Sequence, residues 1–385
     1  MGDNASNNRT RVAFSVTNCI CFDQRVLKMA ETVSSLDCDI TIVGRWLGEF
    51  CDSVSVPFKT KRFRMLFKQG FLFYKFFNIR LFFYLLFHRY DIIVANDLDT
   101  LLPGFIVSKL KRVILVYDSH EYFTGLPELN SRPFVKWVWK SIEKMIFPHL
   151  KYVITVSNSI ATQYEKEYGA GSVVIRNYSR VSSDIHSFTR EELGVNNEHL
   201  LLIFQGSGIN IDKGGEELIV AISITDKTSL LIVGSGDVLE DLKKKTEKLN
   251  MSGRIKFISK VPWKELMRYT RSADAGLSLE KDTNLNYRFS LPNKLFDYIS
   301  AGIPVITGDL PEIRKVIMEN DCGIIIPEIT PAEISKAIIK LRDDSELLNK
   351  LKHNSVSTSE ILNWKNESKK VVDFYRKILM DKRII

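Results

Sequence analysis

Two side chains that could hold a ligand, Asn293 and Asp297, stand four residues apart in the segment FSLPNKLFDYISAGIPVITG (residues 289–308). A spacing of four places them on one face of a helix. Pro292 suits the first turn of that helix, and Gly302 marks its end. Because free N–H groups and the helix dipole point out of the amino end, the segment predicts an anion site with a carboxylate one turn further in. An ordinary α/β unit with a surface aspartate is the alternative.

Glycine-rich turns follow two other apolar runs. In FQGSGINIDKGGEEL, Gly206 and Gly208 allow a ligand to approach the backbone closely, and Lys213 could reach an anion held there. This turn lacks the third glycine of a dinucleotide fingerprint and is not a P-loop. The turn VGSGD (residues 233–237) is more typical of a plain tight turn.

Acidic and histidine side chains follow two runs in the first half of the chain. VYDSHEYF places His120 and Glu121 just past an expected strand, where a histidine could be catalytic or structural. ANDLDT contains Asp97 and Asp99, which superficially resemble a DxD metal motif, although chance in an acidic turn is the better interpretation. The five cysteines lack the spacing of zinc ligands, so we expect no metal site.

These residues need parallel sheets to position them. Short apolar runs alternate with helical stretches along the chain, which predicts an α/β protein whose sheets carry helices on both faces. We expect a disordered N-terminus (1–10), a first domain (11–178), a second domain (179–365) and a C-terminal helix (366–385) that packs back on the first domain. The polar segment 177–194 is the expected link. Two doubly wound, Rossmann-like domains would bind ligand at the carboxyl ends of their strands, in a central cleft.

The overall charge indicates an anionic partner. The 385 residues suggest two domains, and a net charge of +8 with a pI near 9.0 favours a nucleic acid, a nucleotide or an anionic lipid. The first ten residues lack the apolar core of a signal peptide, so we expect a cytosolic chain.

A basic aromatic segment, residues 57–91, suggests where a lipid would bind. It contains eight Lys and Arg and no acid before Asp91, and Lys75 and Arg80 interrupt its apolar stretch. We expect a basic amphipathic helix pair on an anionic membrane surface, with packing of 71–87 inside the first domain as the alternative. The expected membrane contacts are Lys61, Arg62, Arg64 and Lys68. Nucleic acid is not expected, because the basic residues belong to no binding motif.

The order of these motifs resembles the retaining glycosyltransferases of family 4, which have the two-domain GT-B fold. The motifs, within residues 11–327, are DQRVLKMAETV, NDLDTLL, YDSHEYF, VITVSNSIATQYEKEYG, KGGEEL, LLIVGSGD and LPNKLFDYISAGIPVI. The resemblance implies transfer of a hexosyl or N-acetylhexosaminyl group from a UDP- or GDP-sugar to a glycan or lipid-linked acceptor. It also implies a peripheral protein at the cytoplasmic face of the cell membrane, active in polysaccharide or glycoconjugate biosynthesis without a cofactor or an obligatory metal.

The resemblance also implies roles for single residues in the second domain. The family has two glutamates separated by seven residues, and the second, which binds the ribose, matches Asp297. The first would fall at Phe289, so its contact with the donor sugar is absent or comes from a neighbour such as Glu280 or Glu121. Pro292 and Asn293 stand at the start of the helix, where the diphosphate would lie.

Lysine and histidine complete the implied site. Lys213 matches the family's phosphate-binding lysine, while the arginine that usually stands five residues earlier is replaced by Gly208, so Lys294 could supply the second positive charge. His120 matches a histidine that reaches the donor sugar from the first domain. Two other functions stay open: a non-catalytic sugar-nucleotide-binding partner, suggested by Phe289, and a GT-B nucleotide-sugar epimerase, which needs no acceptor.

Overall fold

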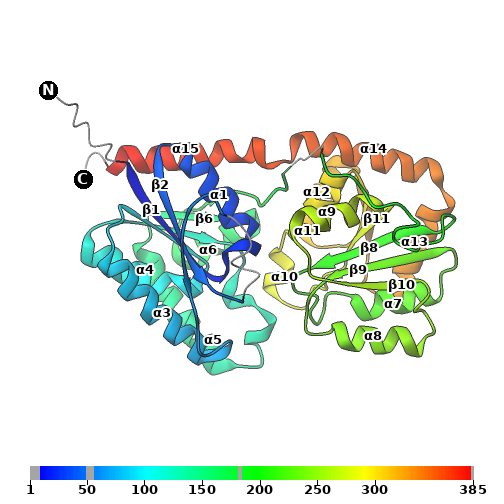
Figure 1. Cartoon of the computed structure of the whole chain (residues 1–385), viewed down its shortest axis with the longest axis horizontal. Helices are drawn as coiled ribbons and strands as arrows, with labels where there is room; N and C mark the ends of the chain where they lie inside the picture. The colour runs from blue at the N-terminus through cyan, green and yellow to red at the C-terminus, as the bar shows by residue number, and fades with distance from the viewer. Residues whose placement is uncertain (1–8, 49–55, 181–183, 383–385) are drawn as a thin grey trace. The chain divides into compact units, whose positions relative to one another are not determined.

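The computed structural model describes residues 9–48, 56–180 and 184–382. The chain divides into two compact units (Figure 1). Unit 1 comprises the residues up to Arg176 together with those from Glu367 onward, and unit 2 comprises Asn177–Asn366. Each unit is built on one parallel sheet with helices packed against it, so the predicted α/β class is confirmed.

Unit 1 contains a seven-stranded sheet among its described residues, in the order β3-β2-β1-β4-β5-β6-β7. Its strands are β1 (Thr10–Cys19), β2 (Cys38–Arg45), β3 (Lys59–Phe63), β4 (Ile92–Asn96), β5 (Ile114–Ser119), β6 (Tyr152–Thr155) and β7 (Val173–Val174). Its helices are α1 (Gln24–Ser34), α3 (Gly70–Phe87), α4 (Leu98–Lys111), α5 (Pro133–Ile146), α6 (Asn158–Tyr168) and most of α15 (Trp364–Lys382). Short 3₁₀ turns are η1 (Ile20–Phe22), η2 (Phe123–Gly125), η3 (Pro127–Leu129) and η4 (Phe147–His149).

Unit 2 contains a six-stranded sheet in the order β10-β9-β8-β11-β12-β13. Its strands are β8 (Leu200–Gly206), β9 (Thr228–Gly234), β10 (Ile255–Ser259), β11 (Ala275–Ser278), β12 (Val305–Gly308) and β13 (Gly323–Ile326). Its helices are α7 (Gly215–Ser223), α8 (Leu239–Lys248), α9 (Trp263–Ser272), α10 (Leu285–Phe289), α11 (Asn293–Ala301), α12 (Pro311–Asn320), α13 (Pro331–Asp343) and α14 (Ser345–Ile361).

Both sheets reverse their strand order beside their first strand. In unit 1 the reversal lies between β1 and β4, and in unit 2 it lies between β8 and β11. The central strands β4 and β8 are apolar until the polar residues near their carboxyl ends, Asn96 and Gln205, because helices cover both faces and the side chains along the strands are buried. Open α/β sheets bind ligands outside the carboxyl ends of the strands at such a reversal. The loops that follow β4, β5, β8 and β11 therefore contain the candidate residues.

The two ends of the chain contribute to unit 1. Thr10 begins β1, and the remainder of the expected disordered N-terminus, apart from Arg9, lies outside the described residues. Helix α15 packs against unit 1 through Val371, Tyr375 and Ile378, which are buried. The Tyr152 hydroxyl donates a hydrogen bond of 2.5 Å to the Asp381 carboxylate on α15.

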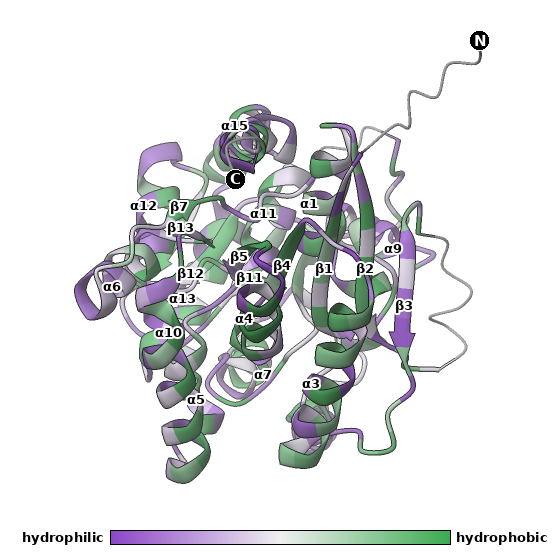
Figure 2. Ribbon diagram, turned by 90° about the vertical axis from the view of Figure 1, so that its left-hand side faces the viewer, coloured by the Kyte–Doolittle hydropathy of each residue, from purple (hydrophilic) through white to green (hydrophobic). Residues whose placement is uncertain are grey.

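The basic aromatic segment does not form the expected pair of amphipathic helices. Its first part forms the edge strand β3, drawn largely purple beside β2 in Figure 2, and only its second part forms a helix, α3. A polar strand can pair at the open edge of a sheet, so the charged residues of KTKRF did not require a helix. The inner face of α3 joins the core of unit 1 through Phe73, Phe77, Leu81 and Leu85, which confirms the alternative for that face. By length and composition alone, α3 is the described helix that could cross a membrane, with a mean hydropathy of 1.4.

Candidate functional site

Helix α11 forms where the sequence predicts it, and its amino end lies near the reversal in unit 2. Pro292 is the extended residue just before the helix, and Gly302 ends it with a positive φ of 76°. The next residues continue into β12, which begins at Val305. The first turn of α11 contains Lys294, whose side chain is buried.

A buried ion pair joins α11 to the end of β11. Lys294 Nζ lies 2.8 Å from Glu280 Oε1, and the two side chains are 9% and 2% exposed. Glu280 also accepts a hydrogen bond of 2.7 Å from the Ser278 hydroxyl. Burial raises the pKa of Glu280, but Lys294 and Lys213 outweigh burial and lower this pKa to about 2. Burial likewise lowers the pKa of Lys294, and Glu280 opposes that shift.

This ion pair bears on two expectations about the site. Lys294 does not add an uncompensated second positive charge, because Glu280 balances it at 2.8 Å. Glu280 is the buried counter-ion of Lys294, and its contact with a donor sugar stays a prediction. Phe289, at the position of the missing acid, is the half-buried last residue of α10.

Lys213 is the uncompensated charge of this cluster. Its Nζ lies 5.3 Å from the centre of the Tyr287 ring, and within the described parts of the chain it has no ion-pair partner. Lys213 is close enough to Glu280 and Lys294 to shift the pKa of each. Two lysines and one glutamate leave a net charge of +1 at the ends of β8 and β11, which suits an anion.

Gly214 brings Lys213 to this position. It has a φ of 74° and precedes α7, and a Cβ atom there would lie 2.7 Å from the Leu279 backbone oxygen. The Lys281 N–H donates a hydrogen bond of 2.9 Å to the Asp212 carbonyl, which ties the two loops together. A glycine is therefore required for Lys213 to lie beside Glu280.

Gly234, in the second glycine turn, serves packing. Gly234 has a φ of 144°, and a Cβ atom there would lie 1.8 Å from the Gly206 carbonyl oxygen. The Ser235 N–H donates a hydrogen bond of 3.0 Å to that same oxygen. The turn at 233–237 is thus held against the turn that follows β8, whereas Gly208 would have room for a Cβ atom.

Asn293 and Asp297 share a face of α11, as their spacing predicts. Asn293 Oδ1 accepts a hydrogen bond of 2.7 Å from Asn177 Nδ2, and Asp297 Oδ1 accepts one of 2.5 Å from the Ser179 hydroxyl. The Asp297 carboxylate also accepts hydrogen bonds from Trp263 Nε1 (3.2 Å) and Gln205 Nε2 (3.3 Å), and its residue is 8% exposed. The ribose role of Asp297 stays a prediction, and this carboxylate already has partners within unit 2.

A second cluster lies in unit 1, where neighbouring strands β4 and β5 end. His120 Nδ1 lies 3.3 Å from Asp97 Oδ2, and His120 Nε2 lies 3.5 Å from Asp118 Oδ2. The His120 backbone N–H donates a hydrogen bond of 2.8 Å to Asp97 Oδ1. Behind Asp118, the Arg25 guanidinium donates hydrogen bonds of 2.6 and 3.1 Å to the two carboxylate oxygens.

The charges of this cluster are set by its geometry. Burial lowers the pKa of His120, but Asp97 and Asp118 outweigh burial and raise it to about 9. Burial raises the pKa of Asp118, but Arg25 and His120 outweigh it and lower this pKa to about 2. Burial and the neighbouring Asp97 raise the pKa of Asp99 to about 8. Burial raises the pKa of Asp97, and the positive His120 opposes that shift, so the protonated imidazole and the Asp97 carboxylate stabilise each other's charge.

Three residues of this cluster were not predicted as site residues: Asp97, Asp118 and Arg25. The two aspartates of the DxD pattern face different partners, because Asp97 faces His120 while Asp99 accepts a hydrogen bond of 2.5 Å from Thr17. The signal that could have found Asp97 is its place directly after an apolar strand, as for His120. Glu121 is half-buried, and its carbonyl accepts a hydrogen bond of 2.9 Å from the Ser119 hydroxyl.

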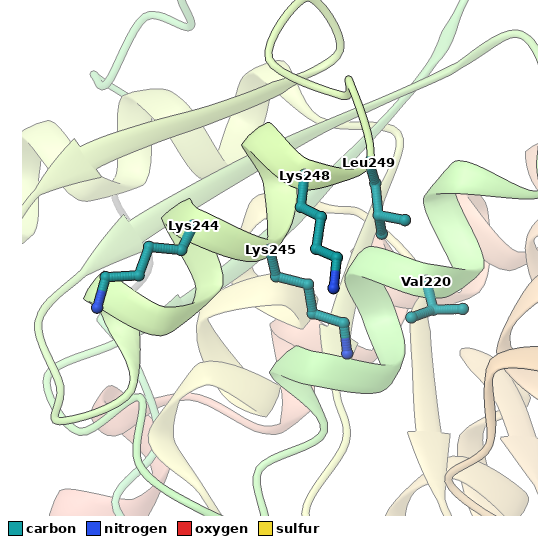
Figure 3. A pocket seen from close by; sticks show the side chains of 5 residues that line it. All are labelled: Val220, Lys244, Lys245, Lys248 and Leu249. Atoms are coloured by element: carbon teal, nitrogen blue, oxygen red, sulfur yellow. The ribbon is translucent and has the colours of Figure 1, made fainter.

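A separate hollow lies on the outside of unit 2, between α7 and α8 (Figure 3). Its volume is about 400 Å³, and it is lined by Val220, Lys244, Lys245, Lys248 and Leu249. None of the predicted site residues lines it. The lysines of this hollow belong to the solvated face of α8 and serve below as controls.

Comparisons with known proteins match both units. A profile described as "Glycosyltransferase Family 4" matches residues 24–178, and one described as "Glycosyl transferases group 1" matches residues 187–357. An uncharacterized glycosyltransferase of Methanocaldococcus jannaschii is 23% identical over 321 residues, which span 79% of this chain and 80% of that protein.

Two further similarities concern a curated enzyme and a solved structure. A chitobiosyldiphosphodolichol beta-mannosyltransferase of Candida albicans is 23% identical over 250 residues, and the match spans 60% of this chain and 54% of that enzyme. The structure of Anabaena Alr3699/HepE in complex with UDP-glucose superposes with a TM-score of 0.76 at 16% identity, covering 96% of this chain and 100% of that one. This superposition confirms the predicted GT-B fold.

Proposed function

Because the chain belongs to the glycosyltransferases of the group 1 and family 4 type, we propose that it moves a sugar, with retention, from a nucleotide-sugar donor to a lipid-linked or glycan acceptor. The donor is a UDP- or GDP-sugar, and the product enters polysaccharide or glycoconjugate biosynthesis. The observation that carries this proposal is the uncompensated Lys213 beside the buried Lys294–Glu280 pair, at the ends of β8 and β11. That arrangement suits the diphosphate of the donor.

The chemistry that this cluster supplies is electrostatic. The bond between the sugar C1 atom and a phosphate oxygen breaks, and its electron pair goes to the departing diphosphate. Lys213 and the free N–H groups at the start of α11 stabilise that charge without reorganisation. The acceptor oxygen forms the new bond to C1 on the face that the diphosphate leaves, and the acceptor proton passes to a phosphate oxygen. No metal ion and no cofactor are needed in this proposal.

The donor is tested first by binding. A panel of UDP-, GDP- and ADP-sugars is added to the full chain, since a ligand that binds only the folded state raises the melting temperature. We expect a UDP- or GDP-sugar to raise the melting temperature of the wild type, and Lys213→Ala to reduce that rise. The matched control is Lys244→Ala, which removes a lysine of the outer hollow and should leave the rise unchanged. An equal reduction in both variants would contradict the assignment of Lys213.

Transfer and its stereochemistry are tested next. The nucleotide sugar that binds is incubated with lipid-diphosphate-linked oligosaccharides, and the product is analysed by NMR. From an α-linked donor, retention gives an α-linked product and inversion a β-linked one. The Candida relative is named a beta-mannosyltransferase, so a β-linked product here would overturn retention while leaving transfer intact. Donor binding without transfer would support the non-catalytic alternative, and epimerisation of the donor without acceptor would support the epimerase.

The acceptor proposal includes the membrane surface of unit 1. Helices α3 and α5 approach each other through Tyr74 and Trp139, whose ring centres are 5.5 Å apart, and Figure 2 shows both helices at the same lower edge of unit 1. Their outward faces expose large apolar side chains: Phe71, Leu72, Phe76, Ile79, Phe83 and Phe87 on α3, and Phe134, Trp137 and Met145 on α5. A folded surface of this kind favours insertion into the lipid interface.

The exposed charged residues of these two helices are all positive. Lys61 and Lys68 are exposed as predicted, as are Lys75 of α3 and Lys144 of α5. Of the other predicted contacts, Arg62 is half-buried, and the Arg64 guanidinium lies 4.6 Å from the Trp46 ring. The single acid of α5, Glu143, is buried. We therefore place the protein at the anionic cytoplasmic face of the cell membrane, as a peripheral protein.

Vesicle sedimentation tests this membrane contact. Each basic residue near an anionic surface contributes about 1 kcal/mol, so changing Lys61, Lys68, Lys75 and Lys144 to Gln should weaken binding to vesicles rich in phosphatidylserine by roughly 1,000-fold. The matched control changes four exposed lysines of unit 2 to Gln: Lys243, Lys244, Lys248 and Lys336. Exchanging Phe134 and Trp137 for serine should weaken binding even at high salt. A wild type that does not sediment with these vesicles at low salt would remove the membrane proposal.

A further inference from the structure

The charged groups around His120 determine which chemistry this residue can perform. Both nitrogens of its ring face carboxylates, Nδ1 at 3.3 Å from Asp97 and Nε2 at 3.5 Å from Asp118. Two carboxylates at these distances favour the protonated ring, although His120 Nε2 makes no hydrogen bond of good geometry within the described residues. The ring is 17% exposed, so one edge of it remains accessible from the end of the sheet.

The backbone at Asp97 is held in a strained conformation. Its φ of 61° and ψ of 167° fall in a region that residues other than glycine rarely occupy. The Asp97 carboxylate is bound in that position by the backbone N–H of His120 at 2.8 Å. Strain of this kind persists only where the surrounding structure over-determines it, and it concentrates at functional sites.

We propose that His120 acts in sugar transfer as a fixed cation that stabilises negative charge on the substrate, and that Asp97 is the positioning residue that keeps it protonated and oriented. This proposal rests on the proposed function. It assigns His120 no proton from the acceptor, because a ring that is already protonated cannot accept another proton. Asp118 contributes the second carboxylate, and Arg25 fixes Asp118 with hydrogen bonds to both of its oxygens.

The other charged groups around the ring leave this charge in place. Asp99 and Glu121 face the same cluster from α4 and from the loop after β5. Burial raises the pKa of Asp99 to about 8, so Asp99 is largely neutral at pH 7 and does not compete for the imidazolium. Asp97 and Asp118 together raise the pKa of His120 to about 9 against the opposing effect of burial.

The charge of His120 is measured without any substrate. The chain contains six histidines, and the Cε1–H NMR signal of His120 in the labelled full chain is identified by its loss in His120→Gln. We expect this signal to titrate near pH 9 in the wild type. In Asp97→Asn the midpoint should fall by at least about one pH unit, because the nearer of two carboxylates loses its charge. The control Asp99→Asn removes an acid from the same turn that does not contact the ring, and should shift the midpoint much less.

Two variants of Asp97 separate positioning from folding. Asp97→Gly removes the carboxylate and relieves the backbone strain, and this relief partly offsets the loss of a buried ion pair, so turnover should drop at least about tenfold in a variant that still folds. Asp97→Asn should lose turnover mainly as the pH rises from 7 to 9, because its histidine becomes neutral at a lower pH than in the wild type.

The results that would overturn the proposal are separate from those that test transfer. A wild-type His120 midpoint at or below pH 7 would overturn it even if transfer is confirmed. Full turnover in Asp97→Gly would also overturn it, because Asp97 would then not position the histidine. If no sugar is transferred under any condition but His120 titrates near pH 9, the proposed function fails while the charge assignment stands.

Discussion

Replacing Lys294 with methionine should destabilise unit 2 strongly, because it leaves the Glu280 carboxylate buried without its closest positive charge. The two charged atoms are 2.8 Å apart, and neither side chain is more than 9% exposed. Methionine preserves the length and the apolar stem of the lysine, so the main change is the loss of the ammonium group. The nearby Lys213 stays in place and supplies the remaining positive potential.

The size of the effect follows from the pKa of Glu280. This pKa falls from an ordinary 4.5 to about 2, a difference of about 2.5 units. At 1.36 kcal/mol for each pH unit, the positive charges around Glu280 contribute about 3 kcal/mol of stability at neutral pH. Removing one partner of a buried ion pair costs roughly 3–5 kcal/mol in other proteins, and this range agrees with the value obtained from the pKa of Glu280. We therefore expect a loss of about 3 kcal/mol at pH 7.

The dependence on pH has a definite sign. The pKa of Glu280 is lower in the folded state than in the unfolded chain, so its contribution is complete above about pH 4.5 and is lost as the pH falls toward 2. The gap in unfolding free energy between the wild type and Lys294→Met should therefore stay nearly constant from pH 7 to about 4.5 and narrow as the pH falls from 4.5 toward 2. The double variant Glu280→Gln with Lys294→Met should recover most of the loss, since no buried charge is left unpaired.

Chemical denaturation of the full chain measures this loss, with one transition fitted for each unit, because a two-unit chain need not unfold in one step. Only the unfolding transition of unit 2 should move, and it should move to a lower denaturant concentration. The control is Lys336→Met, which breaks an exposed pair: Lys336 lies 2.6 Å from Glu333 and is 71% exposed. That pair should contribute at most about 1 kcal/mol. A loss for Lys294→Met no larger than for Lys336→Met would refute the reasoning.

Three further changes test the site and the fold. Lys213→Ala should lower turnover by roughly 100-fold with little change in melting temperature, because it removes one preorganised charge from the departing diphosphate; a collapse of the melting temperature would make Lys213 a structural residue. Asp297→Asn should weaken nucleoside diphosphate binding by roughly 1.5–3 kcal/mol in calorimetry if its carboxylate holds the ribose. Unchanged affinity would make Asp297 a structural residue that binds only Ser179, Gln205 and Trp263. Gly234→Ala should destabilise unit 2 by about 3 kcal/mol or more in the same denaturation assay, since a φ of 144° and a Cβ atom 1.8 Å from a carbonyl oxygen cannot both be relieved locally.

The fold could be predicted because parallel strands that are covered on both faces appear as short, uninterrupted apolar runs. VAFSV, DIIVAN and LLIVGSG are such runs, and they lie in β1, β4 and β9. Helix α11 was also predictable, because Pro292 and Gly302 mark its ends locally. The strand β3 was missed because an edge strand accepts charged residues, and nothing in KTKRF itself indicates that β2 lies beside it.

The site was only partly predictable, because its contacts depend on which strands are neighbours. His120, Lys213 and Glu280 could be named from their places after apolar runs. The partners that define their chemistry could not: Asp97 meets His120 only because β4 and β5 are adjacent, and Glu280 meets Lys294 only because α11 returns to the end of β11. Strand order is a property of the tertiary structure, and the spacing of residues along the chain does not contain it.

The division of the chain into two units has a consequence for folding during synthesis and for the design of truncated variants. Unit 2 is an insertion within unit 1: the chain leaves unit 1 after Arg176 and re-enters it at Glu367. At this crossing the Arg176 N–H donates a hydrogen bond of 2.8 Å to the Glu367 carboxylate, so exit and re-entry lie side by side. During synthesis, therefore, unit 1 cannot close its core over Tyr375 until all of unit 2 has been made. A truncation within α15 would damage the unit encoded first, whereas joining 176 to 367 through a short glycine linker should yield unit 1 as a separate protein.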